Sequence, residues 1–173
     1  WLYDHALFMA IKASLNNISW QEWPEPLKLR HIDAIDQAKI TLKREIEFQC
    51  FMQYKAYQQW YLLKQYANSK GIKIIGDMPI YVALDSSDVW TKPEYFQLDE
   101  HRRPTLVAGV PPDNFSADGQ LWGNPLYNWS VLESHEYSWW IHRVWSNTTM
   151  FDLVRIDHFI GFVNYFSIPF GDK

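Results

Sequence analysis

The strongest chemical signal in the sequence is a strand-like hexapeptide, VRIDHF at residues 154–159, with an arginine and an aspartate two positions apart. Residues i and i+2 of a β-strand point to the same face, so Arg155 and Asp157 are expected to project together. A neighbouring guanidinium favours the ionised form of a carboxyl group. An ionised aspartate at a strand end can act as a nucleophile or an electrostatic stabiliser in glycosyl chemistry. The hexapeptide alone is equally compatible with a structural Arg–Asp pair.

A second aspartate occupies the corresponding place in another predicted strand. Residues 72–75 are mostly apolar, which is typical of a buried parallel strand, and this strand delivers Asp77 at its carboxyl end. A capping box at 130–133 predicts a helix through residue 150, directly before the strand that contains Asp157. The order helix, strand, helix, strand without a hairpin signal predicts a parallel α/β architecture, whose active site lies at the carboxyl ends of the strands.

The sequence before residue 72 is predicted to be mainly helical. Residues 1–16 have apolar side chains at helical spacing, and residues 32–68 contain no Gly or Pro. The second stretch exceeds an ordinary helix, so we expect two consecutive helices, with Gly71 just beyond the end of the second. Five residues of this region form an apolar stripe at helical spacing: Ile46, Cys50, Tyr54, Tyr57 and Tyr61. We expect the Tyr and Trp residues of the region to belong to the core.

A long excursion, residues 81–129, separates the first strand from the following helix and is rich in Pro, Gly, Asp and aromatic residues. Such connections are usually functional or disordered, and this aromatic content disfavours disorder. We expect a short helix capped at 85–87 and a polar turn at 98–105. Segments 110–116 and 120–127 set aromatic rings beside Asp, Asn or Gln, a combination suited to sugars. The alternative is a loop that packs its own aromatics.

Composition excludes several other classes of protein. The 173 residues are 47% hydrophobic and 17% aromatic, and a net charge of -4 argues against nucleic acid as a partner. The single cysteine, Cys50, forms no intrachain disulfide or cysteine zinc cluster. No histidine zinc motif, phosphate loop, serine-hydrolase elbow, membrane-spanning run or signal peptide is visible. We therefore expect a cytoplasmic protein without metal, cofactor or membrane partner, and a segment of a longer chain.

Four motifs occur in a specific order: GDMPIY at 76–81, VAGVPPD at 107–113, QLWGNPLY at 120–127 and VRIDHF at 154–159. Together they resemble the 4-α-glucanotransferases (amylomaltase or disproportionating enzyme) of glycoside hydrolase family 77, in the α-amylase clan. The resemblance covers essentially the whole chain. It implies part of a (β/α)₈ barrel, about strands 3 and 4 with flanking helices, and a substrate-binding insertion at 81–129.

The resemblance also implies roles for individual residues. Asp157 matches the catalytic nucleophile, Arg155 the arginine beside it, and Asp77 an aspartate that contacts the donor sugar. Trp122 matches a donor-side tryptophan. Asp113, Asn114 and Phe115 match a loop that closes over the acceptor. Tyr81 and Asn124, which lie within two of the motifs, complete the expected substrate-binding positions. The family usually has tyrosine in place of Asn114 and arginine in place of Ile160, which puts acceptor preference in question.

The activity implied by the resemblance is transfer of α-1,4-glucan segments through a covalent glucosyl–aspartate intermediate. The substrates would be maltooligosaccharides, amylose or glycogen-derived glucans, with glucose as an acceptor. The family's acid/base glutamate lies on a later strand, so we expect it beyond Lys173 and expect residues 1–173 alone to be inactive. The alternatives are an α-glucan hydrolase of the same clan or, for the segment alone, a glucan-binding domain without turnover.

Overall fold

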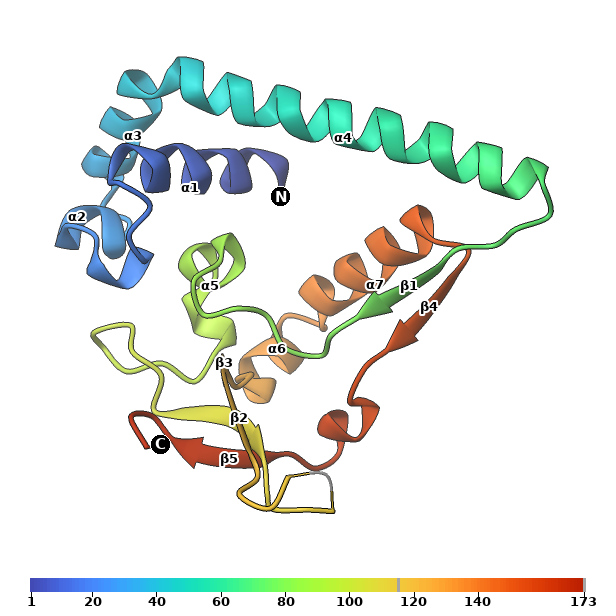
Figure 1. Cartoon of the computed structure of the whole chain (residues 1–173). Coiled ribbons are helices and arrows are strands. Elements are labelled where there is room, and N and C mark those ends of the chain that lie inside the picture. Colours follow the sequence, from blue (N-terminus) through green and yellow to red (C-terminus); the bar gives the residue numbers. More distant parts are fainter. Residues whose placement is uncertain (115, 173) are drawn as a thin grey trace. The chain divides into compact units, whose positions relative to one another are not determined.

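The structure, a computed structural model, describes residues 1–114 and 116–172 (Figure 1). The chain divides into two compact units. The first unit comprises Trp1–Leu63 and Asp85–Lys92, and the second comprises Lys64–Leu84 and Pro93–Lys173. The chain thus leaves the second unit after Leu84, contributes residues 85–92 to the first unit, and returns to the second at Pro93. The predicted excursion 81–129 is divided between the two units, and its role as a substrate-binding subdomain stays a prediction.

The first unit is helical, as the sequence predicts. Its elements are α1 (Leu2–Ser14), the short 3₁₀ helix η1 (Trp20–Glu22), α2 (Glu25–Lys28), α3 (Ile32–Thr41), the first part of α4 (Lys43–Ser69) and α5 (Ser87–Thr91). The predicted helix at 1–16 and the two consecutive helices over 32–68 are confirmed. Gly71 has a φ of 75° beyond the end of α4, the left-handed conformation that glycine adopts most readily.

Aromatic rings fill the core of the first unit. The ring centroids of Phe8, Trp23 and Trp90 lie 5.3 to 5.8 Å apart. Trp90 is buried on α5 and donates its indole N–H to the carbonyl of Leu27 at 3.0 Å. The predicted cap of this helix is confirmed, because the Ser86 hydroxyl accepts a hydrogen bond from the Val89 amide.

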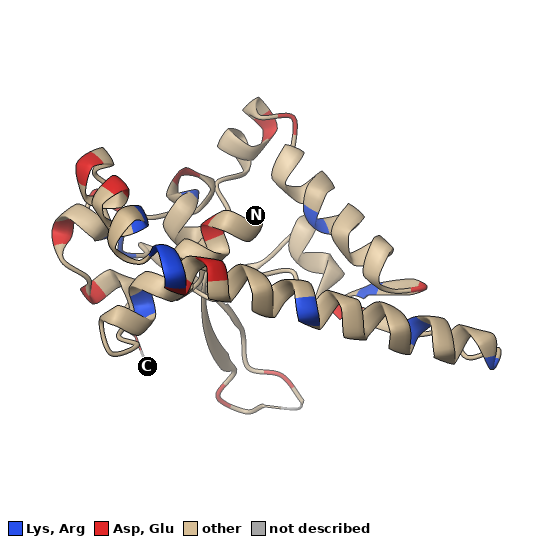
Figure 2. Cartoon of the chain, turned by 90° about the horizontal axis from the view of Figure 1, so that it is seen from above, with Lys and Arg blue, Asp and Glu red and all other residues tan. Residues whose placement is uncertain are grey.

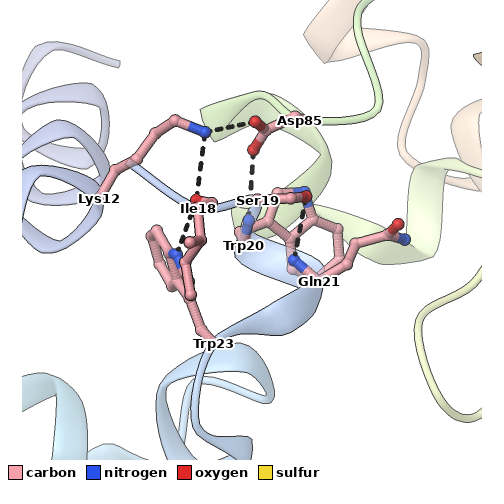
Figure 3. Close-up of polar contacts among 7 residues, drawn as sticks. All are labelled: Lys12, Ile18, Ser19, Trp20, Gln21, Trp23 and Asp85. Carbon is pink, nitrogen blue, oxygen red and sulfur yellow. Dashed lines mark hydrogen bonds and ion pairs between the residues drawn. The ribbon is translucent and has the colours of Figure 1, made fainter. Parts of the chain in front are cut away.

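One carboxylate ties α5 to the segment after α1 (Figure 3). Asp85 accepts hydrogen bonds from the ammonium of Lys12 and, at 3.3 Å, from the backbone N–H of Trp20. Lys12 also donates to the carbonyl of Ile18 at 3.3 Å, and the Trp23 indole N–H donates to the same carbonyl. The ion pair therefore fixes the entry of 85–92 into the first unit.

The apolar stripe and the other tyrosines of 32–68 are only partly in the core of the described structure. Ile46 is buried with 3% of its surface exposed, but Tyr54 is 60% exposed and Tyr66 is 64% exposed. The prediction that the tyrosines of this region are core residues is therefore wrong for these two side chains.

The second unit contains two small sheets. In the first sheet, β1 (Ile75–Met78) pairs in parallel with β4 (Leu153–Ile156), which confirms a parallel α/β pairing. The predicted strand at 72–75 is displaced, and Asp77 lies inside β1. The second sheet is antiparallel, in the order β3 (Gln120–Pro125), β2 (Leu106–Val110), β5 (Phe166–Pro169), and the sequence analysis missed it.

Two helices follow β3 where one was predicted. These are α6 (Trp129–Ser134) and α7 (Ser138–Met150), and α7 packs along both β1 and β4. Glu136 and Tyr137 have φ values of 54° and 52°, which interrupt the helix. The capping box at 130–133 is wrong: Asn128 is the N-cap, and Ser130 lies within the first turn. A polar turn at 98–105 is confirmed by the antiparallel bridge between Leu98 and Pro104.

The charged residues are spread along the chain. Figure 2 shows Lys and Arg distributed over separate helices and loops, in keeping with the net charge of -4. In the part of the chain that the structure describes, none of the helices is long and apolar enough to cross a membrane.

Candidate active site

The parallel pairing of β1 with β4 brings the two predicted catalytic segments together. The register places Asp77 opposite Arg155, and the Asp157 amide donates to the carbonyl of Met78 at 3.0 Å. Pairing therefore continues one residue past β4. Because side chains alternate along a strand, Arg155 and Asp157 emerge on the same side. The two strand ends thus present one basic and two acidic side chains together.

A glycine makes this strand pairing possible. A Cβ on Gly76 would lie 2.2 Å from the ring of Phe151, the residue between α7 and β4. Glycine at this position therefore lets the Phe151 ring lie directly against the β1 backbone. Gly76 thereby allows β1 and β4 to bring Asp77 and Arg155 together.

One guanidinium links both carboxylates. Arg155 donates from Nε to Asp77 Oδ1 at 3.0 Å and from Nη2 to Asp77 Oδ2 at 2.8 Å. The same Nη2 donates to Asp157 Oδ1 at 2.9 Å, so Arg155 and Asp157 project together as the spacing predicts. The three side chains are 54 to 61% exposed. Bidentate pairing fixes the plane of the Asp77 carboxylate.

The ion pairs determine what each carboxylate can do. The hydrogen bond and charge of Arg155 lower the pKa of Asp77 below its ordinary value, and Asp77 raises the pKa of Arg155. Asp77 therefore stays anionic at neutral pH and is a poor proton donor. Among the described side chains, none hydrogen-bonds Oδ2 of Asp157. That oxygen is open to an electrophile.

An aromatic group adjoins the ion pairs. The centroid of the Trp122 ring lies 4.9 Å from that of His158, with the planes at 85°. Tyr81 lies beside both rings, at 6.3 Å from Trp122 and 6.5 Å from His158. Trp122 is 37% exposed, whereas Tyr81 is only 7% exposed. Trp122 can therefore offer a ring face to a ligand, and Tyr81 forms a layer beneath it.

The remaining predicted residues have structural contacts of their own. Asn124 donates from Nδ2 to the carbonyl of Val82 at 2.8 Å, which ties β3 to the segment after β1. Asp113 accepts from the Ser116 amide at 2.8 Å, and Asp113 and Asn114 are exposed on the loop 111–119 between β2 and β3. The described ion-pair cluster consists of Asp77, Arg155 and Asp157 and does not include this loop. Phe115 lies outside the described residues.

Comparison with known proteins decides the family. All residues, 1–173, match the family model described as 4-alpha-glucanotransferase. The chain belongs to this glucanotransferase family. It is 53% identical over 169 residues to the 4-alpha-glucanotransferase of Thermus thermophilus, with 98% of this chain and 34% of that protein covered. It is 49% identical over 174 residues to that of Clostridium butyricum, with 100% and 36% covered.

Solved structures agree with this assignment. The amylomaltase from Streptococcus agalactiae in complex with acarbose is 48% identical, with a TM-score of 0.96 over 100% of this chain and 35% of that one. The amylomaltase from Corynebacterium glutamicum is 18% identical with a TM-score of 0.73 over 99% of this chain and 22% of that one, and shares the fold. The chain thus spans about a third of the length of its glucanotransferase relatives.

A metal centre is not part of the described site. Residues 1–114 and 116–172 contain no group of three or more His, Cys, Asp or Glu side chains able to hold a metal ion.

Sequence reasoning missed one side chain of this glucanotransferase segment and left another undecided. Arg143 on α7 donates to the carbonyls of Pro79 and Ile80 at 2.5 and 2.8 Å, directly after β1. Its position three and four residues after two tryptophans is a visible sign of cation–π packing in a helix. The motif VRIDHF does not indicate what His158 contacts, and the structure shows its ring against Trp122.

Proposed function

We propose that the complete protein containing this chain is a 4-α-glucanotransferase that acts by a retaining double displacement. Asp157 attacks the anomeric carbon of an α-1,4-linked glucose unit and forms a glucosyl–aspartate ester, and the remaining glucan leaves with a proton from a general acid. The 4-hydroxyl of an acceptor sugar then attacks the anomeric carbon, gives its proton to the same group, now acting as a base, and releases Asp157 as a carboxylate. The supporting observation is the carboxylate of Asp157, oriented through Oδ1 by Arg155 with Oδ2 open.

The neighbouring side chains have separate proposed roles in orienting the nucleophile and binding the sugar. Arg155 holds the nucleophile in place, and Asp77, anionic and fixed by the same guanidinium, accepts hydrogen bonds from the donor sugar. Trp122 offers an exposed ring face to the apolar face of that sugar. Tyr81 and Asn124 support this surface from beneath and behind, and the loop 111–119, with Asp113, Asn114 and Phe115, closes over the acceptor.

The general acid/base comes from the part of the protein that this chain does not span. A retaining mechanism needs two carboxyl groups about 5–5.5 Å apart, one of them protonated. Asp77 does not suit this role, because Arg155 lowers its pKa. We therefore expect residues 1–173 alone to show no turnover, and detectable disproportionation by this segment would contradict the inference.

We infer that β1 and β4 are adjacent strands, about the third and fourth, of a (β/α)₈ barrel. They are parallel, they are joined through α7, and their carboxyl ends carry the candidate site. Ile75 is 65% exposed and Leu153 is 54% exposed, as expected for strands whose neighbours come from the rest of the barrel.

The substrates that fit this proposal are maltooligosaccharides, amylose or glycogen-derived glucans, with glucose as an acceptor. The similarity to an amylomaltase solved with acarbose supports an oligosaccharide ligand. Incubation of the complete protein with maltotriose tests the reaction. Transfer yields both glucose and oligomers longer than maltotriose, whereas an α-glucan hydrolase yields shorter products alone, and that outcome would reject transfer.

Asp157→Asn tests the nucleophile. The amide is isosteric but does not form the glycosyl ester, so we expect kcat in the complete protein to fall by at least about 10³-fold. Acarbose binding, measured by calorimetry, should persist because Trp122 and Asp77 remain. Asp33→Asn, at an exposed position on α3, is the matched control and should leave turnover unchanged. Retained turnover in Asp157→Asn would remove the assignment.

A further inference from the structure

We propose that His158 is a positioning residue that fixes the orientation of Trp122 and thereby couples the donor-sugar platform to the strand end that carries Asp157. This inference rests on the proposed function, because Trp122 has this role only if a glucan is the donor. His158 is half-buried and lies next to the nucleophile in sequence. Its ring nevertheless faces the aromatic group, whereas the side chain of Asp157 pairs with Arg155.

The backbone separates the two neighbouring side chains. His158 has a φ of 52°, a left-handed conformation at the start of the 3₁₀ helix η3 (Phe159–Phe162). Adjacent side chains of a strand point to opposite sides, so Asp157 pairs with Arg155 while the imidazole meets Trp122, and the left-handed turn at His158 then starts η3. Asn, Asp and His are enriched among the residues that adopt this conformation, so histidine fits here without unusual cost.

Two contacts, in addition to the Tyr81 ring beneath, define the plane of Trp122. Its indole N–H donates to Gln120 Oε1 at 3.0 Å, which holds one edge of the ring. The imidazole of His158 meets the indole at 4.9 Å and 85°, the edge-to-face arrangement that aromatic pairs prefer. A hydrogen bond at one atom leaves the ring free to tilt, and the perpendicular imidazole removes that freedom. The exposed indole face is therefore presented in one orientation.

The space around the imidazole is shaped for it. A Cβ on Gly161, in η3, would lie 2.9 Å from His158 Cδ2 and 2.9 Å from Ile80 Cδ1. Glycine at this position thus admits the imidazole next to the segment that follows β1. Tyr81 lies 6.5 Å from the imidazole and itself stacks on Tyr127 at 6.0 Å and 19°. The imidazole is confined between η3 and Trp122.

The test uses His158→Asn in the complete protein, because asparagine tolerates the left-handed backbone and only the ring is lost. We expect KM for maltotriose and Kd for acarbose to rise about threefold to tenfold, the range for loss of one edge-to-face ring pair, with kcat changed less than about twofold. His142→Asn is the matched control, since it removes an imidazole that also contacts a tryptophan, Trp145, but on α7. It should leave both constants unchanged.

A double-mutant cycle separates positioning from a general structural role. In a Trp122→Ala background, His158→Asn should have no further effect on KM or Kd, because the ring that it positions is absent. Gly161→Ala keeps the imidazole but displaces it, so a smaller rise in KM that disappears in the Trp122→Ala background is expected. Equal effects of His158→Asn in both backgrounds, or an unchanged KM, would overturn the proposal. Failure of the proposed function is distinct, since it appears as missing transfer in the unmodified protein.

Discussion

Replacing Arg143 tests how the structure holds the segment after β1. The guanidinium donates from Nη1 to the Ile80 carbonyl at 2.8 Å and to the Tyr127 hydroxyl at 3.2 Å, and from Nη2 to the Pro79 carbonyl at 2.5 Å. Its Cζ also lies 5.4 and 5.0 Å from the centroids of the two rings Trp139 and Trp140. Arg143→Met keeps much of the aliphatic stem and removes the charged donors.

The magnitude follows from which groups lose their partners. A hydrogen bond from a charged donor contributes about 1.5–3 kcal/mol, but the three bonds do not simply add. The Ile80 carbonyl keeps the Tyr127 hydroxyl as a donor at 2.7 Å, and the Pro79 carbonyl lies where water replaces the lost donor. The loss therefore approaches one such bond. With about 0.5–1 kcal/mol for the cation–π contact, we expect destabilisation of about 2–4 kcal/mol.

Urea unfolding of the complete protein, followed by tryptophan fluorescence, measures this change. We expect the transition that reports the second unit to move to lower urea for Arg143→Met, with a smaller shift for Arg143→Lys, which keeps the charge but not the planar fork. Arg103→Met is the matched control. Its ion pair with Asp99 is at the surface, with Arg103 59% exposed, and contributes at most about 1 kcal/mol. Equal stability of Arg143→Met and Arg103→Met would refute the reasoning.

Two further substitutions test other contacts of the second unit. The Asp152 carboxylate accepts from the Ile74 amide and the Asn68 side chain, and these bonds lower its pKa, so its stabilisation is present at neutral pH and is lost as the pH falls below about 4. Asp152→Asn should therefore lower the melting temperature at pH 7 but reduce its fall between pH 5 and 3, unlike Asp33→Asn. Gly109→Ala should destabilise the antiparallel sheet by about 2 kcal/mol or more, because a Cβ there would lie 2.5 Å from a backbone oxygen of β3. Urea unfolding measures this change, and an unchanged midpoint would contradict that close approach.

The parallel strand pair was predictable because its signals are local. An apolar run that ends in Asp77 and the i, i+2 spacing of Arg155 and Asp157 are both visible in a few residues. The position of β1 was not, since the run 72–75 offers apolar residues while pairing begins only at Ile75. Register depends on where Gly76 admits the Phe151 ring, and that contact joins residues far apart in sequence.

The antiparallel sheet escaped prediction for a related reason. The central strand β2 is a continuous apolar run without alternation, and its two partners come from β3 and from the distant β5. A shift in register between Val107 and Gly109 further disturbs the pattern. The helix break at Glu136 and Tyr137 was hidden as well, since neither residue is a glycine or proline. The misleading capping box, Ser130 and Glu133, lies inside α6 on exposed positions.

The candidate site shows the same division between local and distant information. The ion pairs arise from strand spacing, but the platform beside them depends on a left-handed turn at His158 and on β3 returning to meet it. The segment after Asp77 depends on a further distant element, because Arg143 on α7 donates hydrogen bonds to the carbonyls of Pro79 and Ile80. Substitution of Arg143 should therefore change sugar binding without direct contact with the sugar. The proposed nucleophile, Asp157, is specified by its own strand, whereas the proposed platform for the donor, Trp122, is specified by contacts between distant segments.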